Sequence, residues 1–456
     1  MASVVGLDIG TTTICAVVWA PDRGDLIAVR SVPNAARVAG LPRGHDEQDA
    51  ECIWSSVCEL LRSTLALPAV RGSGVKSIAL TGQMHGVLLA DASLRARTPL
   101  ITWRDQRMAV GAGAERLARA RDRLGAGYAV RSGCDLHVGY GGATLCWLAA
   151  EGRLSGGLTA LGIADFVQAR LTGALFSEPT AAASWGLLDV HRLDWDAQIV
   201  EALRIPEEVL PDLRPSGAAC GKLLSERADE LGCACDTAVH APLGDNQASV
   251  IGAGGGRAGV AVLNLGTGGQ LSVPRECPEH LPGLETRPMP GGGYIVVGAS
   301  LSAGAAYASL CRFFRACVRE LTDSKLGTED LYAQLNRLAA AAPPGAEGLR
   351  ADTRLLGTRS DPLRRGGLSG LDSTNLTPSN LARAFCEGLI EELAEAAARI
   401  GMGGIREIAA GGNAVRKNPL LIELIANRFG LPCALSPHTE EAAAGAARWA
   451  AMERSA

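Results

Sequence analysis

A short pattern that occurs twice places the strongest constraint on the fold of this chain. Residues 7–11 read Leu-Asp-Ile-Gly-Thr, and residues 263–267 read Leu-Asn-Leu-Gly-Thr. Each copy leads an apolar, strand-like stretch through an acidic or amide residue into a Gly-Thr turn, and a second strand-like stretch follows, which is typical of a β-hairpin. The duplicated hairpin predicts two domains that resemble each other.

The length agrees with two domains, because 456 residues exceed the roughly 250–300 at which a single hydrophobic core stops growing. The second hairpin begins a little past the middle of the chain, just after a run of glycines at 254–256. We predict an N-terminal domain over residues 1–246 and a C-terminal domain over residues 247–456. Strand-like and helix-like stretches alternate around both hairpins, which favours an α/β fold with a mixed sheet flanked by helices in each domain.

Capping residues and apolar spacing predict three helices. Asp49 is placed to cap a helix whose apolar residues recur at helical spacing. Asn418 and Pro419 form an N-cap and first-turn pair ahead of another apolar face. Residues 440–452 are nearly all alanine around Gly445, so we expect the backbone of this last helix to pack unusually close to a neighbour or a ligand.

Composition and charge exclude several classes of function. The net charge is -4 and no cluster of Lys and Arg stands out, so we predict no nucleic-acid partner. No stretch approaches the ~20 apolar residues of a membrane-spanning helix, so we predict no membrane association. The 13 cysteines are scattered and odd in number, which fits reduced thiols and a cytoplasmic protein better than a disulfide framework. The sequence leaves the oligomeric state open, with a homodimer among the alternatives.

The first hairpin carries chemistry suited to phosphate. A Walker A loop is absent, because the nearest candidate, residues 217–223, has its glycines too close together and Leu223 where a metal-binding hydroxyl is needed. By contrast, residues 8–13 place a carboxylate beside a turn rich in hydroxyl and backbone N–H donors. Such a turn can bind phosphate oxygens while Asp8 holds Mg²⁺. A purely structural turn is the alternative for one copy, and the second copy argues against it.

Further motifs follow the first hairpin in a fixed order. Residues 244–248 read Gly-Asp-Asn-Gln-Ala, residues 409–413 read Ala-Ala-Gly-Gly-Asn, and an alanine-rich stretch closes the chain. In this order the motifs resemble the actin-like ATPase superfamily and, within it, the FGGY carbohydrate kinases, over nearly the whole chain. The resemblance implies two ribonuclease H-like domains with a cleft between them, ATP and Mg²⁺ as cofactors, and a small sugar as acceptor. It implies these ATP-binding residues: Gly10, Thr11, Thr12, Thr13, Gly266, Thr267, Gly304, Gly411, Gly412, Asn413 and Asn418.

Asp245, within the second of these motifs, is the candidate catalytic base. A sugar hydroxyl that attacks a phosphoryl group must lose its proton, and a carboxylate within hydrogen-bond reach accepts it, an effect worth roughly 10²–10⁴-fold in rate. An Asp that merely caps the following helix is the structural alternative. The resemblance implies the catalytic role, and we expect Asp245 to share the Mg²⁺ site with Asp8.

Two polar stretches that follow strand-like segments, residues 81–86 and 102–107, are candidates for binding the acceptor. They combine hydrogen-bonding side chains with an aromatic ring, as recognition of a sugar requires. We predict these substrate-binding residues: Gln83, Met84, His85, Trp103, Asp105 and Asn246.

Several segments resemble the ketose kinases of the family. Glycerol kinases carry an Arg-Glu pair at the position of Met84 and His85, which disfavours glycerol. Thr144 stands where most members of the family carry Lys, and the segment around it is similar to that of the sedoheptulokinases. We therefore expect phosphorylation of the terminal primary hydroxyl of a ketose, sedoheptulose to sedoheptulose 7-phosphate, with D-xylulose to xylulose 5-phosphate as the alternative. A sugar-responsive ATPase switch that phosphorylates nothing is a further alternative, against which Asp245 argues.

Overall fold

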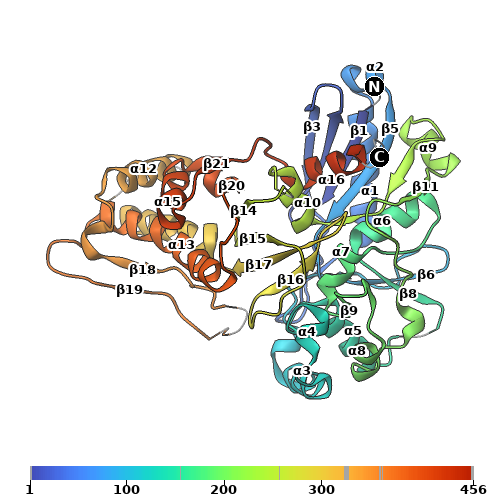
Figure 1. Ribbon diagram of the computed structural model, residues 1–456, viewed down its shortest axis with the longest axis horizontal. Coiled ribbons are helices and arrows are strands. Elements are labelled where there is room, and N and C mark those ends of the chain that lie inside the picture. Colours follow the sequence, from blue (N-terminus) through green and yellow to red (C-terminus); the bar gives the residue numbers. More distant parts are fainter. Residues whose placement is uncertain are drawn as a thin grey trace.

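Two mixed sheets, one in each half of the chain, form the framework of the molecule (Figure 1). The structure is a computed structural model that describes residues 3–154, 156–255, 257–322, 328–358, 361 and 363–452. Among these residues, no helix has the length and apolar character needed to cross a membrane.

The first sheet contains the first predicted hairpin at its centre. Its strand order is β11-β12-β5-β1-β2-β3, and the short strand β13 pairs with the end of β5. β1 runs antiparallel to β2 and parallel to β5. The strands are β1 (Ser3–Ile9), β2 (Thr13–Ala20), β3 (Asp25–Pro33), β5 (Val75–Gly82), β11 (Ala219–Lys222), β12 (Ala238–His240) and β13 (Leu243–Gly244).

The second sheet repeats this pattern, with the strand order β16-β17-β15-β14-β20-β21. β14 runs antiparallel to β15 and parallel to β20, as β1 does to β2 and β5. The strands are β14 (Val260–Leu265), β15 (Gly269–Arg275), β16 (Glu285–Pro288), β17 (Tyr294–Ser300), β20 (Glu407–Gly411) and β21 (Cys433–Leu435). The prediction of two similar α/β units is therefore confirmed.

Helices cover both faces of each sheet, and two of them cross between the halves. Helices α1 (Ala50–Leu65), α6 (Ile163–Thr172) and α9 (Ser225–Leu231) pack on one face of the first sheet. Its other face is covered by α16 (Glu441–Met452), which comes from the end of the chain. Conversely, α10 (Asp245–Gly252), which follows the first sheet, packs on the second sheet against β14 and β17.

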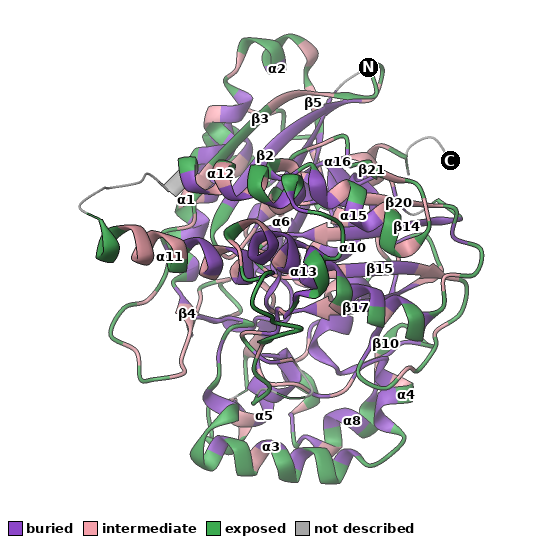
Figure 2. Ribbon diagram, turned by 90° about the vertical axis from the view of Figure 1, so that its left-hand side faces the viewer, coloured by how far each residue is buried: buried purple, intermediate pink, exposed green. Residues whose placement is uncertain are grey.

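The other face of the second sheet carries the largest group of helices of the C-terminal half. These are α11 (Ala303–Leu321), α12 (Thr328–Ala341), α13 (Pro378–Ile400) and α15 (Leu420–Phe429). The outward surface of this layer consists mostly of exposed and partly buried residues, whereas buried residues concentrate on strands such as β5 and β15 and on α10 (Figure 2).

An inserted lobe lies between β5 and β11 and packs around its own core. The elements of the lobe are β6 (Leu88–Asp91), α3 (Gly111–Leu124), α4 (Tyr128–Ser132), α5 (Gly141–Ala150), β8 (Leu158–Leu161), α7 (Pro179–Ala182), β9 (Leu188–Asp189), β10 (Asp194–Trp195) and α8 (Ala197–Ala202). Strands of the second sheet reach this lobe, because Thr286 N donates to Gly133 O (2.7 Å) and the Tyr294 hydroxyl donates to Val190 O (2.8 Å).

All three predicted helices are present, and one of them has a different N-cap from the one predicted. The Asp49 carboxylate accepts from two backbone amides at the start of α1, as an N-cap does. In α16, a Cβ on Gly445 would lie 2.7 Å from the carbonyl carbon of Ala248, so α16 and α10 touch backbone to backbone as predicted. The third helix, α15, begins one residue later than predicted, with Pro419 rather than Asn418 at the N-cap position.

Candidate functional site

The turn of the first hairpin is tight and has exposed hydroxyls. Gly10 N donates to Thr13 O (3.0 Å), and a Cβ on Gly10 would lie only 2.8 Å from that oxygen, so the turn requires glycine here. Thr12 and Thr13 are exposed, whereas Thr11 is partly buried. The hydroxyls of Thr12 and Thr13 are therefore available to an anion, whereas the Gly10 N–H is used within the turn.

Asp8, at the end of β1, is an acidic side chain with a spare oxygen. Its Oδ1 atom is buried and has no hydrogen-bond partner. Burial, reinforced by the negative charges of Asp245 and Glu440, raises the pKa of Asp8. An unsatisfied carboxylate oxygen among other carboxylates is the type of ligand that a hard divalent cation prefers.

The carboxylates of Asp8 and Asp245 suit Mg²⁺, which takes only one or two protein ligands, better than a metal ion that the protein must bind with a full set of its own side chains. Within the described part of the chain, no group of three or more His, Cys, Asp or Glu residues is arranged to hold a metal ion. Mg²⁺ is usually bound by one or two carboxylates together with water and substrate phosphates, so Asp8 with Asp245 nearby is a sufficient protein contribution.

Asp245 is the first residue of α10 and lies where the two halves meet. The preceding residues, Leu243 and Gly244, pair with the end of β5, so the first sheet fixes the start of the helix. Burial raises the pKa of Asp245 to about 6, while the charge of Arg287 and the backbone N–H of Asn246 act in the opposite direction. The carboxylate is therefore largely ionised at neutral pH and can accept a proton.

The two residues after Asp245 connect α10 to the second sheet. Asn246 Nδ2 donates to Gln270 Oε1 (2.9 Å) and more weakly to Ser272 Oγ (3.4 Å) on β15. Gln247 Nε2 donates to the Pro288 carbonyl oxygen (3.1 Å) at the end of β16. The Asn246 Oδ1 atom is buried and lacks a partner, so this amide can still accept one hydrogen bond.

Gln83 and Trp103 lie against the first hairpin. The indole Nε1 of Trp103 donates to Thr11 Oγ1 (2.9 Å), and the same hydroxyl donates to Gln83 Oε1 (3.0 Å). Gln83 Nε2 donates in turn to Gln48 Oε1 (2.8 Å). Trp103 remains 39% exposed, so its ring can cover a ligand. Thr11 is thus bound to two of the predicted substrate-binding residues, unlike Thr12 and Thr13.

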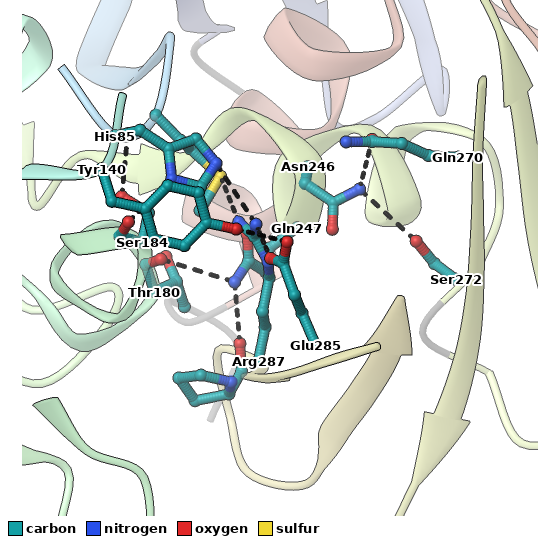
Figure 3. A network of polar contacts seen from close by, with 12 residues as sticks. His85, Tyr140, Thr180, Ser184, Asn246, Gln247, Gln270, Ser272, Glu285 and Arg287 are labelled. Atoms are coloured by element: carbon teal, nitrogen blue, oxygen red, sulfur yellow. Dashed lines mark hydrogen bonds and ion pairs between the residues drawn. The ribbon is translucent and has the colours of Figure 1, made fainter. Parts of the chain in front are cut away.

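Met84 and His85 form a buried cluster with Arg287 and Tyr140 (Figure 3). Arg287 approaches Met84 Sδ through Nη1 and His85 Nε2 through Nη2, both at 3.3 Å. The imidazole of His85 stacks on the Tyr140 ring, with 4.2 Å between centroids. A positive φ of 70° at His85 shows that the loop holds this residue in an uncommon backbone conformation.

Asp105 has a different environment from the one predicted for a sugar ligand. One carboxylate oxygen accepts from Arg107 Nε (2.8 Å), and the other accepts from Arg107 Nη2 (2.8 Å) and from Asp46 N (2.9 Å). Only 2% of the residue is exposed. Asp105 therefore holds together the loop that presents Trp103, because its lone pairs are engaged by the protein.

The second hairpin turn meets the start of α11. Gly304 N donates to Gly266 O and Ala305 N donates to Thr267 O, both at 3.0 Å. Gly268 O accepts from Gly266 N (2.9 Å), which closes the turn. The predicted residues Gly266, Thr267 and Gly304 are therefore brought together at the N-terminal end of α11, where the N–H groups of Gly304 and Ala305 hold the turn.

The remaining predicted ATP-binding residues, from the later part of the chain, separate into two groups. Gly411 ends β20, and Asn413 begins α14 (Asn413–Lys417). Gly412 between them has a φ of 88°, and a Cβ there would lie 2.5 Å from the Leu265 carbonyl oxygen, so it lies against β14 of the second hairpin. Asn418 lies elsewhere: it is buried, and its Nδ2 donates to Cys386 Sγ (3.5 Å) on α13. Its side chain is directed into the core.

Sequence reasoning missed several polar residues of this region. Gln48, Glu285, Arg287 and Glu440 stand in no phosphate motif. Glu285 and Arg287 lie two positions apart on β16, so their side chains share one face of a buried strand. This pair of opposite charges was the only sequence signal that could have indicated a buried ion pair here. Nothing in the sequence indicates that β16 contacts the inserted lobe.

Comparisons with known proteins agree with this arrangement. Residues 3–252 match the N-terminal domain, and residues 261–454 the C-terminal domain, of the FGGY family of carbohydrate kinases. Sedoheptulokinase from Homo sapiens is 28% identical, covering 97% of this chain and 96% of that protein. Glycerol kinase from Gloeobacter violaceus is 29% identical, covering 98% and 87%.

A solved structure gives the same result for the fold. The crystal structure of xylulose kinase from Rhodospirillum rubrum has a TM-score of 0.86 and 25% identity, and it covers 99% of this chain and 90% of that one. Both family domains are present in order, and together they span almost the whole sequence. The chain belongs to the FGGY family of carbohydrate kinases and is a sugar kinase.

Proposed function

We propose that this sugar kinase transfers the terminal phosphoryl group of ATP to the terminal primary hydroxyl of sedoheptulose, giving sedoheptulose 7-phosphate and ADP. The full-length similarity to human sedoheptulokinase supports this acceptor. Met84 and His85, in place of the Arg-Glu pair of glycerol kinases, support a ketose over glycerol. D-xylulose is the alternative acceptor.

The position of Asp245 carries the proposal. Its carboxylate begins a helix at the junction of the two halves, with a pKa of about 6 that leaves it ionised at neutral pH. In the proposed mechanism Asp245 accepts the proton of the attacking hydroxyl. Because phosphoryl transfer passes through a loose transition state, orientation of the hydroxyl by Asp245 contributes as much as its basicity.

The two hairpins are proposed to bind the nucleotide. Thr12 and Thr13, with the N–H groups around Gly10, donate to phosphate oxygens from the first sheet, and the Gly266–Thr267 turn does so from the second. Gly411, Gly412 and Asn413 are proposed to contact adenosine. Mg²⁺, when bound, neutralises phosphate charge, and Asp8 is proposed to hold it together with Asp245.

The acceptor is proposed to lie beside Trp103, with Gln83 and Asn246 reading its hydroxyls. Both ring nitrogens of His85 already have partners in the protein, so His85 is proposed to shape the acceptor site. The indole offers a flat face to the carbon chain, and the spare acceptor atom of Asn246 suits a hydroxyl.

The division into domains at residues 246 and 247 stays a prediction and falls within α10. Cytoplasmic location likewise stays a prediction.

A panel of acceptors tests the proposal. Purified protein is assayed for ADP release and for sugar phosphate with sedoheptulose, D-xylulose, D-ribulose and glycerol. The highest kcat/KM is expected for sedoheptulose. Strict preference for D-xylulose would show that xylulose, not sedoheptulose, is the acceptor. ADP release without any sugar phosphate would favour the ATPase switch.

Asp245→Asn tests the base. The variant is expected to lose about 10²–10⁴-fold in kcat, while ATP binding changes little. Retention of activity within tenfold of the wild type would remove Asp245 from the mechanism.

A further inference from the structure

Arg287 is a buried charge that the mechanism above does not use. It belongs to β16 of the second sheet, yet its side chain extends among residues of the first half (Figure 3). Only 3% of Arg287 is exposed. A buried guanidinium without compensating partners is strongly unfavourable, so the contacts of Arg287 indicate why the site retains it.

Glu285, two residues earlier on the same strand, neutralises this charge. Arg287 Nε donates to Glu285 Oε2 (2.9 Å), and Nη2 contacts the same oxygen. The other carboxylate oxygen of Glu285 accepts from the Tyr140 hydroxyl. Tyr140 in turn supports the ring of His85. The ion pair thus reaches the predicted acceptor residues both directly and through an aromatic ring.

The contacts of His85 define its tautomer. Its Nδ1 lies 2.7 Å from the Ser184 carbonyl oxygen, which can only accept, so Nδ1 carries the hydrogen. In the neutral ring Nε2 then presents a lone pair, and Arg287 Nη2, which can only donate, faces it. The backbone N–H of His85 also donates to Ser184 Oγ (2.9 Å), so the residue is held at three points.

The same arginine lies against the segment that carries Asp245. Met84 Sδ, which accepts from Arg287 Nη1, lies so close to Gly244 that a Cβ there would be 3.0 Å from the sulfur. On the other side, Pro288 O accepts from Gln247. Arg287 therefore stands between the acceptor loop and the first turn of α10. A thioether is a weak acceptor, which leaves the Nη1 group with donor capacity for a sugar hydroxyl.

We propose that Arg287 is a positioning residue of the acceptor site, supplied by the second half of the chain, which fixes the orientation and tautomer of His85 and braces Met84 against the segment before Asp245. The inference rests on the proposed function for its acceptor. It makes the acceptor site a joint product of both halves, so the sugar is bound productively only when β16 is docked on the inserted lobe.

The test compares variants that keep the buried charge balanced. Arg287→Met combined with Glu285→Gln removes both charges together, so that no unpaired ion remains. Arg287→Lys keeps the charge but cannot serve Glu285 and His85 at once. Arg131→Met is a control for the loss of another ion pair: Arg131 pairs with Asp196 (2.7 Å), and the Asp196 carboxylate keeps the backbone amides of Gln198 and Ile199 as partners. Each variant is assayed for kcat and for the KM of acceptor and of ATP, with thermal melting as a check of folding.

The expected result separates acceptor from nucleotide. The double variant should raise the acceptor KM by about 10- to 100-fold, the range expected for lost hydrogen bonds to a charged group, with the KM for ATP within twofold. Arg287→Lys should recover part of this loss. Arg131→Met should lower the melting temperature without changing either KM.

A second readout does not depend on turnover. Selective ¹⁵N labelling of the 7 histidines, with the His85 signals assigned by their absence in His85→Gln, reports which ring nitrogen carries the hydrogen. The wild type should show the Nδ1–H tautomer, and these signals should move in the double variant and in Arg287→Lys but not in Arg131→Met.

Failure of the inference differs from failure of the proposed function. A wild-type protein that phosphorylates no sugar would refute the function, while the histidine signals would still test the contact. The inference would be overturned if the wild type is active and the double variant keeps its acceptor KM within threefold and its His85 signals unchanged. If the double variant does not fold, the same outcome for Arg287→Lys would overturn it.

Discussion

Replacing Gly445 by Ala should disrupt the contact between the two crossing helices and lower both stability and turnover. The new Cβ would lie 2.7 Å from the carbonyl carbon of Ala248 and 2.8 Å from the amide nitrogen of Gly252, and closer still to the Ala248 oxygen. Carbon atoms in contact normally stay about 3.5–4.0 Å apart. All of these obstacles are backbone atoms of α10, so no side chain can rotate away, and the helices must separate by about an ångström or more.

The magnitude follows from two opposing effects. Alanine in a helix interior is favoured over glycine by about 1 kcal/mol. Overpacking of a tight contact destabilises by about 1–3 kcal/mol, and a backbone obstacle places this variant at the upper end. A net loss of about 2 kcal/mol corresponds to a fall in melting temperature of about 4–8 °C for a domain of this size.

The control is another helical glycine. Gly72 lies in α2 (Pro68–Ser73), and a Cβ there would meet open space. Gly72→Ala should therefore match or slightly exceed the wild-type melting temperature. Because Ala248 lies in the first turns of the helix that Asp245 begins, Gly445→Ala should also lower kcat, and Gly72→Ala should not. Equal melting temperatures and equal kcat for Gly445→Ala and the wild type would refute the reasoning.

Three further outcomes are expected. Because Asp245 must be ionised to accept a proton and its pKa is raised to about 6, kcat/KM should be constant at higher pH and fall about tenfold per pH unit below about 6; an acid limb near 4 would contradict this. Gly412→Ala, at a φ of 88°, should raise the KM for ATP and lower the melting temperature, whereas Gly403→Ala, which meets open space, should change neither. Trp103→Phe keeps a flat ring but loses the hydrogen bond to Thr11, so the acceptor KM should rise about 3- to 10-fold in steady-state assays; an unchanged KM would remove the indole N–H from acceptor binding.

Local signals in the sequence were sufficient for the architecture. The strand, Gly-Thr turn and second strand around Gly10 and Gly266 appear in the structure as equivalent hairpins at the centres of two equivalent sheets. Asp49 caps its helix because capping is decided within one turn of chain. Such features depend on neighbours in sequence, which a single chain displays directly.

Features that depend on distant partners were not accessible in this way. Asp105 looked like a free polar group, and only the fold shows that Arg107 and the Asp46 amide occupy its carboxylate. Asn418 looked like a helix cap, and the fold turns it toward Cys386. Which partner a buried polar side chain finds is decided by tertiary packing, so motif and spacing identify the residue but not its contact.

In the proposed mechanism, the exchange of helices between the halves lets one carboxylate, that of Asp245, serve both substrates. The strand that precedes Asp245 pairs with the first sheet, whereas the helix that follows it packs on the second. The charge of Asp245 raises the pKa of Asp8, which belongs to the first sheet. The charge of Arg287, which belongs to the second sheet, lowers the pKa of Asp245. Asp245 therefore interacts with one charged group from each sheet. Any rotation of one sheet relative to the other must therefore change the position of Asp245 relative to at least one of them. In the proposed mechanism Asp245, the two hairpin turns and Arg287 must be aligned together, and binding energy from both substrates favours the relative position of the halves that aligns them.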